Sequence, residues 1–171
     1  MSRWAYLSLL VSLVTGCASV PGPLAVGRFV DVTPQAAQAG QFVGQRVRWG
    51  GIIASTETGE RETCFEVVSR PLDSSARPEQ TDKSEGRFIA CAWGFYDPSV
   101  YAQGREITVT GTIRNAVVRK VGDYDYRFPK VRAETVYLWP KREIYDRWPP
   151  YYYGPYWYGP WPGRYWYPYW W

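Results

Sequence analysis

The sequence predicts a mostly all-β protein, built as a small barrel and followed by an aromatic C-terminal tail. Between residues 41 and 140 the 171-residue chain has runs rich in Val, Ile, Thr and aromatic residues, separated by Gly, Pro and Asp. This is the pattern of short strands joined by turns. The composition, 46% hydrophobic and 21% charged, fits one globular domain with extra segments and excludes a polytopic membrane protein. The absence of histidine excludes imidazole catalysis and most zinc sites.

Residues 1–16 are predicted to be a signal peptide. Arg3 precedes an apolar stretch of about ten residues, which is too short to span a bilayer. The sequence Val14-Thr15-Gly16-Cys17 follows and resembles the lipobox that bacterial lipoprotein signal peptidase cleaves. The resemblance implies that Cys17 becomes the acylated first residue of the mature protein. The alternative is an ordinary secretory signal in which Cys17 is incidental.

Several acyl chains on Cys17 would hold the protein stably in outer-membrane lipid, at about 0.8 kcal/mol per buried CH₂. The next residue is Ala18, whereas an Asp here commonly retains Gram-negative lipoproteins in the inner membrane, so the resemblance implies an outer-membrane location facing the periplasm. Residues 17–40 are expected to be a lipidated tether, rich in Pro and Gly over 18–27. It ends in a short helix over 34–39, with Thr33 as the N-cap.

The barrel is expected to occupy residues 41–140, with five strands over 42–55, 62–69, 87–93, 105–114 and 131–139. Paired glycines at Gly50 and Gly51 are typical of a bulge or bend that lets a small sheet curl. Between the third and fourth strands, Asp97, Pro98 and Gly104 fit the cap, first position and end of a short helix. Five strands with such a helix predict an OB-like barrel, and a β-sandwich is the alternative.

Two cysteines remain once Cys17 carries lipid. Cys64 and Cys91 both lie in strand-like runs of a chain exported to an oxidising compartment. A disulfide between neighbouring strands is the favoured interpretation, and two buried free thiols are the alternative. The chain contains no Cys-x-x-Cys motif, the pattern that would indicate a redox-active pair.

Basic and aromatic side chains predict a binding face on the barrel, formed by Arg48, Trp49, Arg87 and Trp93. In a cytosolic chain such a face would suit single-stranded nucleic acid. The lipid anchor argues against nucleic acid as a partner. The formal charge of +4 falls to about +3 once the signal peptide with Arg3 is removed, which is too small to indicate a polyanion. The alternative is that the aromatic rings pack in the core and the arginines face solvent.

The search for catalytic groups predicts no catalytic residue, cofactor or metal, and hence no enzyme. Acids in the loop over 70–85 and the turn over 123–125 are more simply solvated, and no phosphate-binding loop occurs. The competing hypotheses are a glycan hydrolase that uses carboxylates such as Glu62 and Glu66, and an envelope module that binds glycan or calcium.

The tail is the unusual part of the chain. Residues 141–171 are expected to be a linker followed by an aromatic low-complexity segment, and residues 148–171 contain 8 Tyr, 6 Trp, 6 Pro and 3 Gly. Proline and glycine at this density exclude a regular helix. Tyr and Trp favour the membrane-water interface. The competing uses are contacts with membrane, with glycan or with protein, or no dedicated ligand.

Several ordered segments also resemble a known family. They are the run 47–53, Pro71-Leu72-Asp73 with Arg77-Pro78, Gly86-Arg87-Phe88, Gly94-Phe95-Tyr96-Asp97-Pro98, Tyr101 with Gly104-Arg105, Thr108-Val109-Thr110-Gly111, Tyr126 to Pro129, and Tyr137-Leu138-Trp139. With the lipobox, residues 17 to 139 resemble the Slp family of starvation-inducible outer-membrane lipoproteins. The resemblance implies an outer-membrane location and a link to starvation or envelope stress, and it supplies no catalytic residue. The expected function is that of a non-enzymatic envelope lipoprotein that acts through binding or structural contacts.

Overall fold

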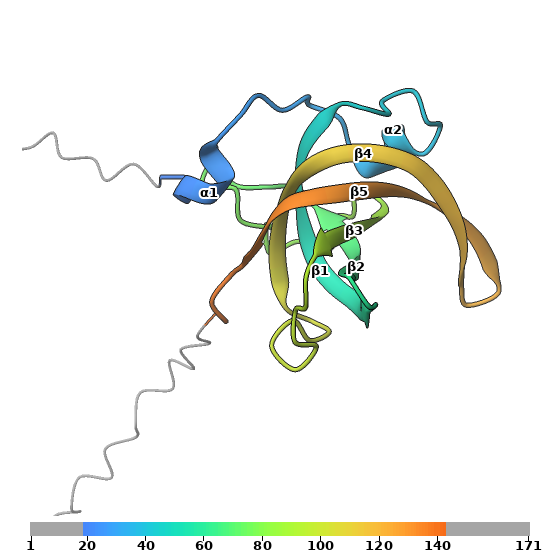
Figure 1. Cartoon of the computed structure of the whole chain (residues 1–171). Coiled ribbons are helices and arrows are strands. Elements are labelled where there is room, and N and C mark those ends of the chain that lie inside the picture. Colours follow the sequence, from blue (N-terminus) through green and yellow to red (C-terminus); the bar gives the residue numbers. More distant parts are fainter. Residues whose placement is uncertain (1–18, 143–171) are drawn as a thin grey trace, which may run out of the picture. The chain divides into compact units, whose positions relative to one another are not determined.

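Five β-strands close into a barrel in the computed structural model, which describes residues 19–142 (Figure 1). The strands are β1 (Arg46–Thr58), β2 (Glu62–Arg70), β3 (Arg87–Trp93), β4 (Glu106–Val121) and β5 (Tyr124–Leu138). They pair in the order β1-β2-β3-β5-β4, and β4 closes the barrel by pairing with β1. β3 and β5 run parallel, and the other neighbours are antiparallel. This closed five-stranded arrangement confirms the predicted OB-like barrel.

Alternating burial along the strands fills the barrel. β2 alternates between buried and partly exposed residues, which places Phe65 and Val67 inside. Both side chains are fully buried in the main core, together with Phe88 of β3 and Ile107 of β4. Trp49 of β1 packs against Phe88 with ring centroids 5.3 Å apart. Large apolar side chains from every part of the sheet therefore meet in one interior.

Two short helices precede the barrel. α2 (Pro34–Ala37) confirms the helix predicted at this place, because Thr33 Oγ1 accepts a hydrogen bond from Ala36 N at 3.3 Å. α1 (Gly22–Ala25) lies within the predicted tether, and its Leu24 side chain is fully buried. This part of the tether is therefore folded onto the barrel. None of the helices in residues 19–142 has the length and hydropathy of a membrane-spanning segment.

The predicted helix between the third and fourth strands is wrong, because residues 97–104 form turns. Val100 N and Tyr101 N both donate to Asp97 O, at 3.0 and 2.9 Å, and Ser99 N donates to Asp97 Oδ1. The first turn does not propagate into a helix because Gly104 N donates to Ile53 O at 2.9 Å. This hydrogen bond holds the end of the segment against β1, so a second helical turn does not form.

The predicted bulge at the paired glycines is also misplaced. β1 shifts register between Ile53 and Ser55, three residues after Gly50. A Cβ atom on Gly51 would overlap the Val68 carbonyl oxygen, which is backbone and has little freedom to move. The glycine therefore permits a close approach of β1 and β2.

β4 and β5 continue well beyond their predicted limits. After a register shift between Arg114 and Val117 they form a two-stranded hairpin over residues 117–128, which we call the arm (Figure 1). Its two-residue turn begins at Gly122, with φ +60°, which suits the first central position of a type II′ turn. The arm is the main departure from a minimal five-stranded barrel.

Candidate functional site

The predicted binding face is not one surface. Trp49 is 5% exposed and its indole Nε1 donates to Val32 O at 2.6 Å, whereas Trp93 is 78% exposed. Arg48 donates to Leu24 O at 3.2 Å, and Arg87 forms an ion pair with Glu66 at 2.7 Å. The physical reason is the period of a strand, since successive side chains point to opposite faces. Arg48 and Trp49 are consecutive, so the Arg48 side chain is partly exposed and most of the Trp49 ring is buried in the core, although both contribute to the lining of one pocket.

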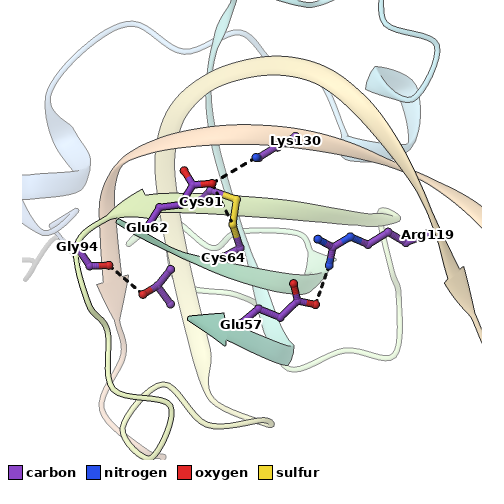
Figure 2. The surroundings of a disulfide bond; sticks show 8 residues. Glu57, Glu62, Cys64, Cys91, Gly94, Arg119 and Lys130 are labelled. Atoms are coloured by element: carbon purple, nitrogen blue, oxygen red, sulfur yellow. Dashed lines mark hydrogen bonds and ion pairs between the residues drawn. A yellow bond between two sulfur atoms is a disulfide. The ribbon is translucent and has the colours of Figure 1, made fainter. Parts of the chain in front are cut away.

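Cys64 and Cys91 form a disulfide bond between β2 and β3, as predicted (Figure 2). The two residues are directly opposite each other in the register, and their sulfur atoms are 2.05 Å apart. Cys91 and Ile89 pack with Phe128 of β5, and side chains of the arm cover this cluster. The disulfide therefore lies beneath the arm on the outer face of the sheet.

Two ion pairs flank this region. Arg119 of the arm contacts Glu57 at 2.7 Å, and Lys130 contacts Glu62 at 3.6 Å (Figure 2). In OB folds the face of the second and third strands binds oligonucleotides and oligosaccharides. Here the chain's own arm occupies part of that face.

The groups near the disulfide do not form a metal site. The donor atoms of Glu62, Cys64 and Cys91 lie within 4.8 Å of one another. Both sulfur atoms are bonded to each other, and only a thiolate would be a strong metal ligand. The Glu62 carboxylate already faces the Lys130 ammonium.

The structure also does not pair the carboxylates of the hydrolase hypothesis. Glu62 and Glu66 lie four residues apart on β2, a spacing of roughly 13 Å along a strand. Glycoside hydrolases place their two carboxyl groups about 5–9.5 Å apart. Each of these glutamates has its own cation, Lys130 for Glu62 and Arg87 for Glu66. Each glutamate therefore belongs to its own surface ion pair with a basic side chain.

One pocket of about 400 Å³ lies between the segment 29–33, β1 and the residues that follow β2, and we call it the Glu85 pocket. Arg48 and Trp49 line it with apolar neighbours such as Phe29 and Leu72. Burial raises the pKa of the Glu85 carboxyl; the nearby Lys83 ammonium lowers this pKa, and the carboxylates of Asp31 and Glu79 raise it. Polar and charged groups of Asp31, Thr33, Arg48 and Glu85 line the pocket beside its apolar residues, so it is more polar than a typical small-molecule site.

A second pocket of about 430 Å³ lies between α2, the residues before β3 and the arm, and we call it the Tyr124 pocket. Gln35 and Gln38 come from α2 and its end, and Tyr124 and Tyr126 come from the arm. Arg87 lines this second pocket, whereas Trp93 lines neither. Neither glutamine was predicted to be a site residue, and Tyr124 was predicted to lie in a turn.

The two ends of the described chain meet in one place. Leu24 of α1 packs with Ala76 and with Trp139, the residue after β5, and Val20 packs against them; we call this group the terminal cluster. The Trp139 indole Nε1 donates to Thr108 Oγ1 at 2.9 Å. Cys17 and the tail lie outside residues 19–142, so their predicted roles stay predictions.

A small β-barrel that follows a lipobox-like N-terminal sequence is the arrangement expected of an envelope lipoprotein. The sequence model of the Outer membrane lipoprotein Slp family matches residues 14–170. The chain belongs to this family, as its motifs predicted. The match continues beyond residue 139, where the recognisable motifs end, and includes nearly all of the tail.

Curated relatives agree with this assignment. The chain is 30% identical over 171 residues to Outer membrane protein Slp of Escherichia coli K12, covering 95% of this chain and 89% of the relative. It is 34% identical to Uncharacterized lipoprotein YeaY of the same organism, over 88% of this chain and 86% of the relative. The family and these relatives identify an outer-membrane envelope lipoprotein, a class that is not named for an enzymatic activity.

Among solved structures, a small single-stranded DNA-binding protein from Streptomyces coelicolor is similar at a TM-score of 0.34 and 9% identity. The alignment covers 56% of this chain and 94% of that protein.

Proposed function

We propose that this protein is a non-enzymatic lipoprotein anchored in the outer membrane through acylated Cys17, with its barrel facing the periplasm. The aromatic residues of 148–171 serve as a second contact with the membrane interface, and nucleic acid is not a partner. The link to starvation or envelope stress belongs to this proposal and is supported by family membership. The observation that carries the membrane arrangement is the terminal cluster.

The terminal cluster fixes where both ends of the chain leave the barrel. Val20 packs in the cluster and is three residues from Cys17, a span of at most about 11 Å. Trp139 packs in the same cluster and is nine residues before Trp148. Acylation of Cys17 would therefore hold the side of the barrel that carries the terminal cluster near the lipid surface. The tail begins a few residues after this cluster, so its first residues could reach the lipid surface.

The residue types of the tail fit that surface. Each Tyr or Trp ring is apolar with one polar group, which is the chemistry of the headgroup region. A single acyl chain gives only marginal and reversible binding, and several attachments together give stable anchoring. A tail linked to an anchor needs little affinity of its own, because the linkage raises its effective concentration at the membrane.

Flotation with phosphatidylethanolamine and phosphatidylglycerol vesicles tests the proposal. Four forms are compared: the native chain, Cys17→Ala, a chain lacking 148–171, and the double variant. We expect the native chain to float almost completely, Cys17→Ala to float in part and the double variant to remain soluble. Mass spectrometry should find acyl chains on the native protein and none on Cys17→Ala.

A Gly/Ser segment of 24 residues in place of 148–171 is the control for chain length. Cys17→Ala with this replacement should behave like the double variant. If Cys17→Ala remains unbound whether or not it has the aromatic tail, the tail is not a membrane contact. An unacylated native chain isolated from the outer membrane would contradict the anchor.

A further inference from the structure

We infer that the Tyr124 pocket is a binding site for the neutral pyranose rings of an envelope glycan. Three segments distant in sequence form it: α2 and its end, the residues 84–87, and the tip of the arm. Its volume of about 430 Å³ is within the range of small-ligand sites. This inference concerns a surface separate from the terminal cluster and does not depend on membrane contact by the tail.

The lining groups match the chemistry of a sugar. Gln35 and Gln38 present amides and Tyr124 presents a phenol, whereas the Ser84 hydroxyl already donates to Gly86 O and accepts from Gly86 N. The side chains of Gln35, Gln38 and Tyr124 have no hydrogen-bond partner among residues 19–142, so their donors and acceptors are available. An amide offers two donors and an acceptor, which complements sugar hydroxyls that both donate and accept.

An exposed ring supplies the apolar part of recognition. Tyr124 is 70% exposed, although its backbone is fixed by pairing with Val121 next to the hairpin turn. A pyranose has an apolar face of C–H groups that can stack on such a ring. A large aromatic side chain held at the rim by a rigid hairpin offers this contact at low cost in conformational entropy.

The electrostatics favour a neutral ligand. The part of the chain described by the structure contributes no carboxylate to the pocket lining, and Arg87 is its one charged residue. The guanidinium of Arg87 is paired with the Glu66 carboxylate at 2.7 Å, so its charge is largely compensated. A strongly anionic ligand therefore gains little here.

Hydrogen bonds and close backbone contacts join the three segments that frame the pocket. Tyr126 Oη accepts a hydrogen bond from Arg87 N at 3.0 Å, and Gln35 N donates to Glu85 O at 3.0 Å. Gly86 has φ +101°, and a Cβ atom there would lie 3.0 Å from Gln35 N and 3.2 Å from Tyr126 Oη. The glycine thus lets α2, the strand entry and the arm approach one another closely, which shapes the pocket.

The residues 84–87 also separate the two pockets. Glu85 lines the Glu85 pocket, whereas Ser84, Gly86 and Arg87 line the Tyr124 pocket. The acid lies on one side of this segment, and the amides and phenols lie on the other. This separation keeps the partly buried carboxyl of Glu85 away from the proposed sugar site.

Titration calorimetry on the full chain carrying Cys17→Ala tests the site. The probes are two neutral oligosaccharides, an N-acetylglucosamine tetramer and maltotetraose, with heparin as the anionic comparison. We expect binding of at least one neutral oligosaccharide and weaker binding of heparin. Tyr124→Ala should raise the Kd about tenfold, and Gln38→Ala about fivefold through the loss of one hydrogen bond.

Phe95→Ala is the matched control, because Phe95 is 75% exposed and lies outside the pocket. It should change the Kd by less than twofold, and circular dichroism should show every variant folded. The site is wrong if the folded parent binds no neutral oligosaccharide, or if Phe95→Ala and Tyr124→Ala weaken binding equally. It is also wrong if deletion of 148–171 abolishes binding while Tyr124→Ala leaves it intact.

Two further titrations distinguish the sources of the sugar in the envelope. One uses soluble peptidoglycan fragments and the other uses the core oligosaccharide of lipopolysaccharide. The source is the one whose binding weakens in Tyr124→Ala and not in Phe95→Ala. If both show full affinity for Tyr124→Ala, the proposal is overturned.

Discussion

Glu85 is a single residue whose protonation is coupled to the fold. Burial raises the pKa of its carboxyl above the ordinary value of 4.5, Lys83 lowers this pKa, and Asp31 and Glu79 raise it. The folded protein therefore keeps this proton at pH values where the unfolded chain has released it. The free energy of unfolding must then fall as the pH rises through the window between 4.5 and the raised pKa, and it stays lower above that window.

Replacing Glu85 by glutamine should remove this fall in the free energy of unfolding with rising pH. The amide resembles the protonated acid, so Glu85→Gln should match the parent below pH 4 and be more stable than the parent near pH 7. Thermal unfolding between pH 4 and 7 measures the difference. Glu60→Gln, at an exposed position in the turn before β2, is the charge-matched control. A stability difference between Glu85→Gln and the parent that is constant with pH would contradict this assignment.

Residue type predicted some of the side chains that line the pockets but not how they are grouped. Arg48 and Trp49 line the Glu85 pocket and Arg87 lines the Tyr124 pocket, whereas Trp93 lines neither. Gln35 and Tyr124 are unremarkable in the sequence, and they become neighbours only because α2 and the arm converge. Contacts between residues almost ninety positions apart leave no local signal.

Two kinds of contact attach the arm to the barrel, an apolar cluster and an ion pair. Phe128 is fully buried against Ile89 and Cys91 at the base of the arm. Arg119 and Glu57 form an ion pair whose side chains are 40% and 55% exposed. A buried aromatic residue stabilises by several kcal/mol, whereas an exposed pair contributes about 0.2–1 kcal/mol. The apolar cluster should therefore contribute more to the stability of the arm than the ion pair does.

Urea unfolding of two variants tests this comparison. Phe128→Ala should lower the free energy of unfolding by about 3–5 kcal/mol, and Arg119→Ala by less than about 1 kcal/mol. The effect of Arg119→Ala should shrink at 1 M NaCl, because the Debye length falls to about 3 Å. Phe128→Leu should recover part of the stability. A larger loss for Arg119→Ala than for Phe128→Ala would show that the ion pair holds the arm.

Elements with strong local sequence signals lie where the sequence predicted them. β3 has its predicted limits, and α2 starts at the proline after a threonine cap, because burial patterns and caps are local. The segment 97–104 has equally good capping residues, yet Gly104 N bonds to Ile53 O and the segment stays irregular. α1 and the strands of the arm were missed, although a turn over 123–125 was predicted, because Leu24 and Phe128 are buried by residues distant in sequence. Propensity gives way to tertiary contact at these places.

At the scale of the whole molecule, the terminal cluster brings Val20 and Leu24 together with Trp139. Only two residues separate Cys17 from Val20, which is packed against the cluster. The barrel therefore has little freedom to move away from an acylated Cys17. The lipobox-like motif at Cys17 is a local sequence pattern, and its role stays a prediction. The meeting of Val20 and Leu24 with Trp139 could not be predicted from the sequence, because it depends on the pairing of β5 with β3 and β4.

Lengthening the anchor connection tests this coupling. Twelve Gly/Ser residues inserted between Ala18 and Ser19 behave as a coil with a reach of roughly 20 Å. The effective concentration of the tail at the membrane falls with the length of such a linker, at about the −3/2 power or more steeply. We expect the acylated variant to show less quenching of tryptophan fluorescence by brominated lipids than the native protein. The same insertion between Gly122 and Asp123, at the tip of the arm, should leave quenching unchanged because it moves neither chain end. Equal quenching in the native protein and the anchor-lengthened variant would show that the tail reaches the membrane without help from the terminal cluster.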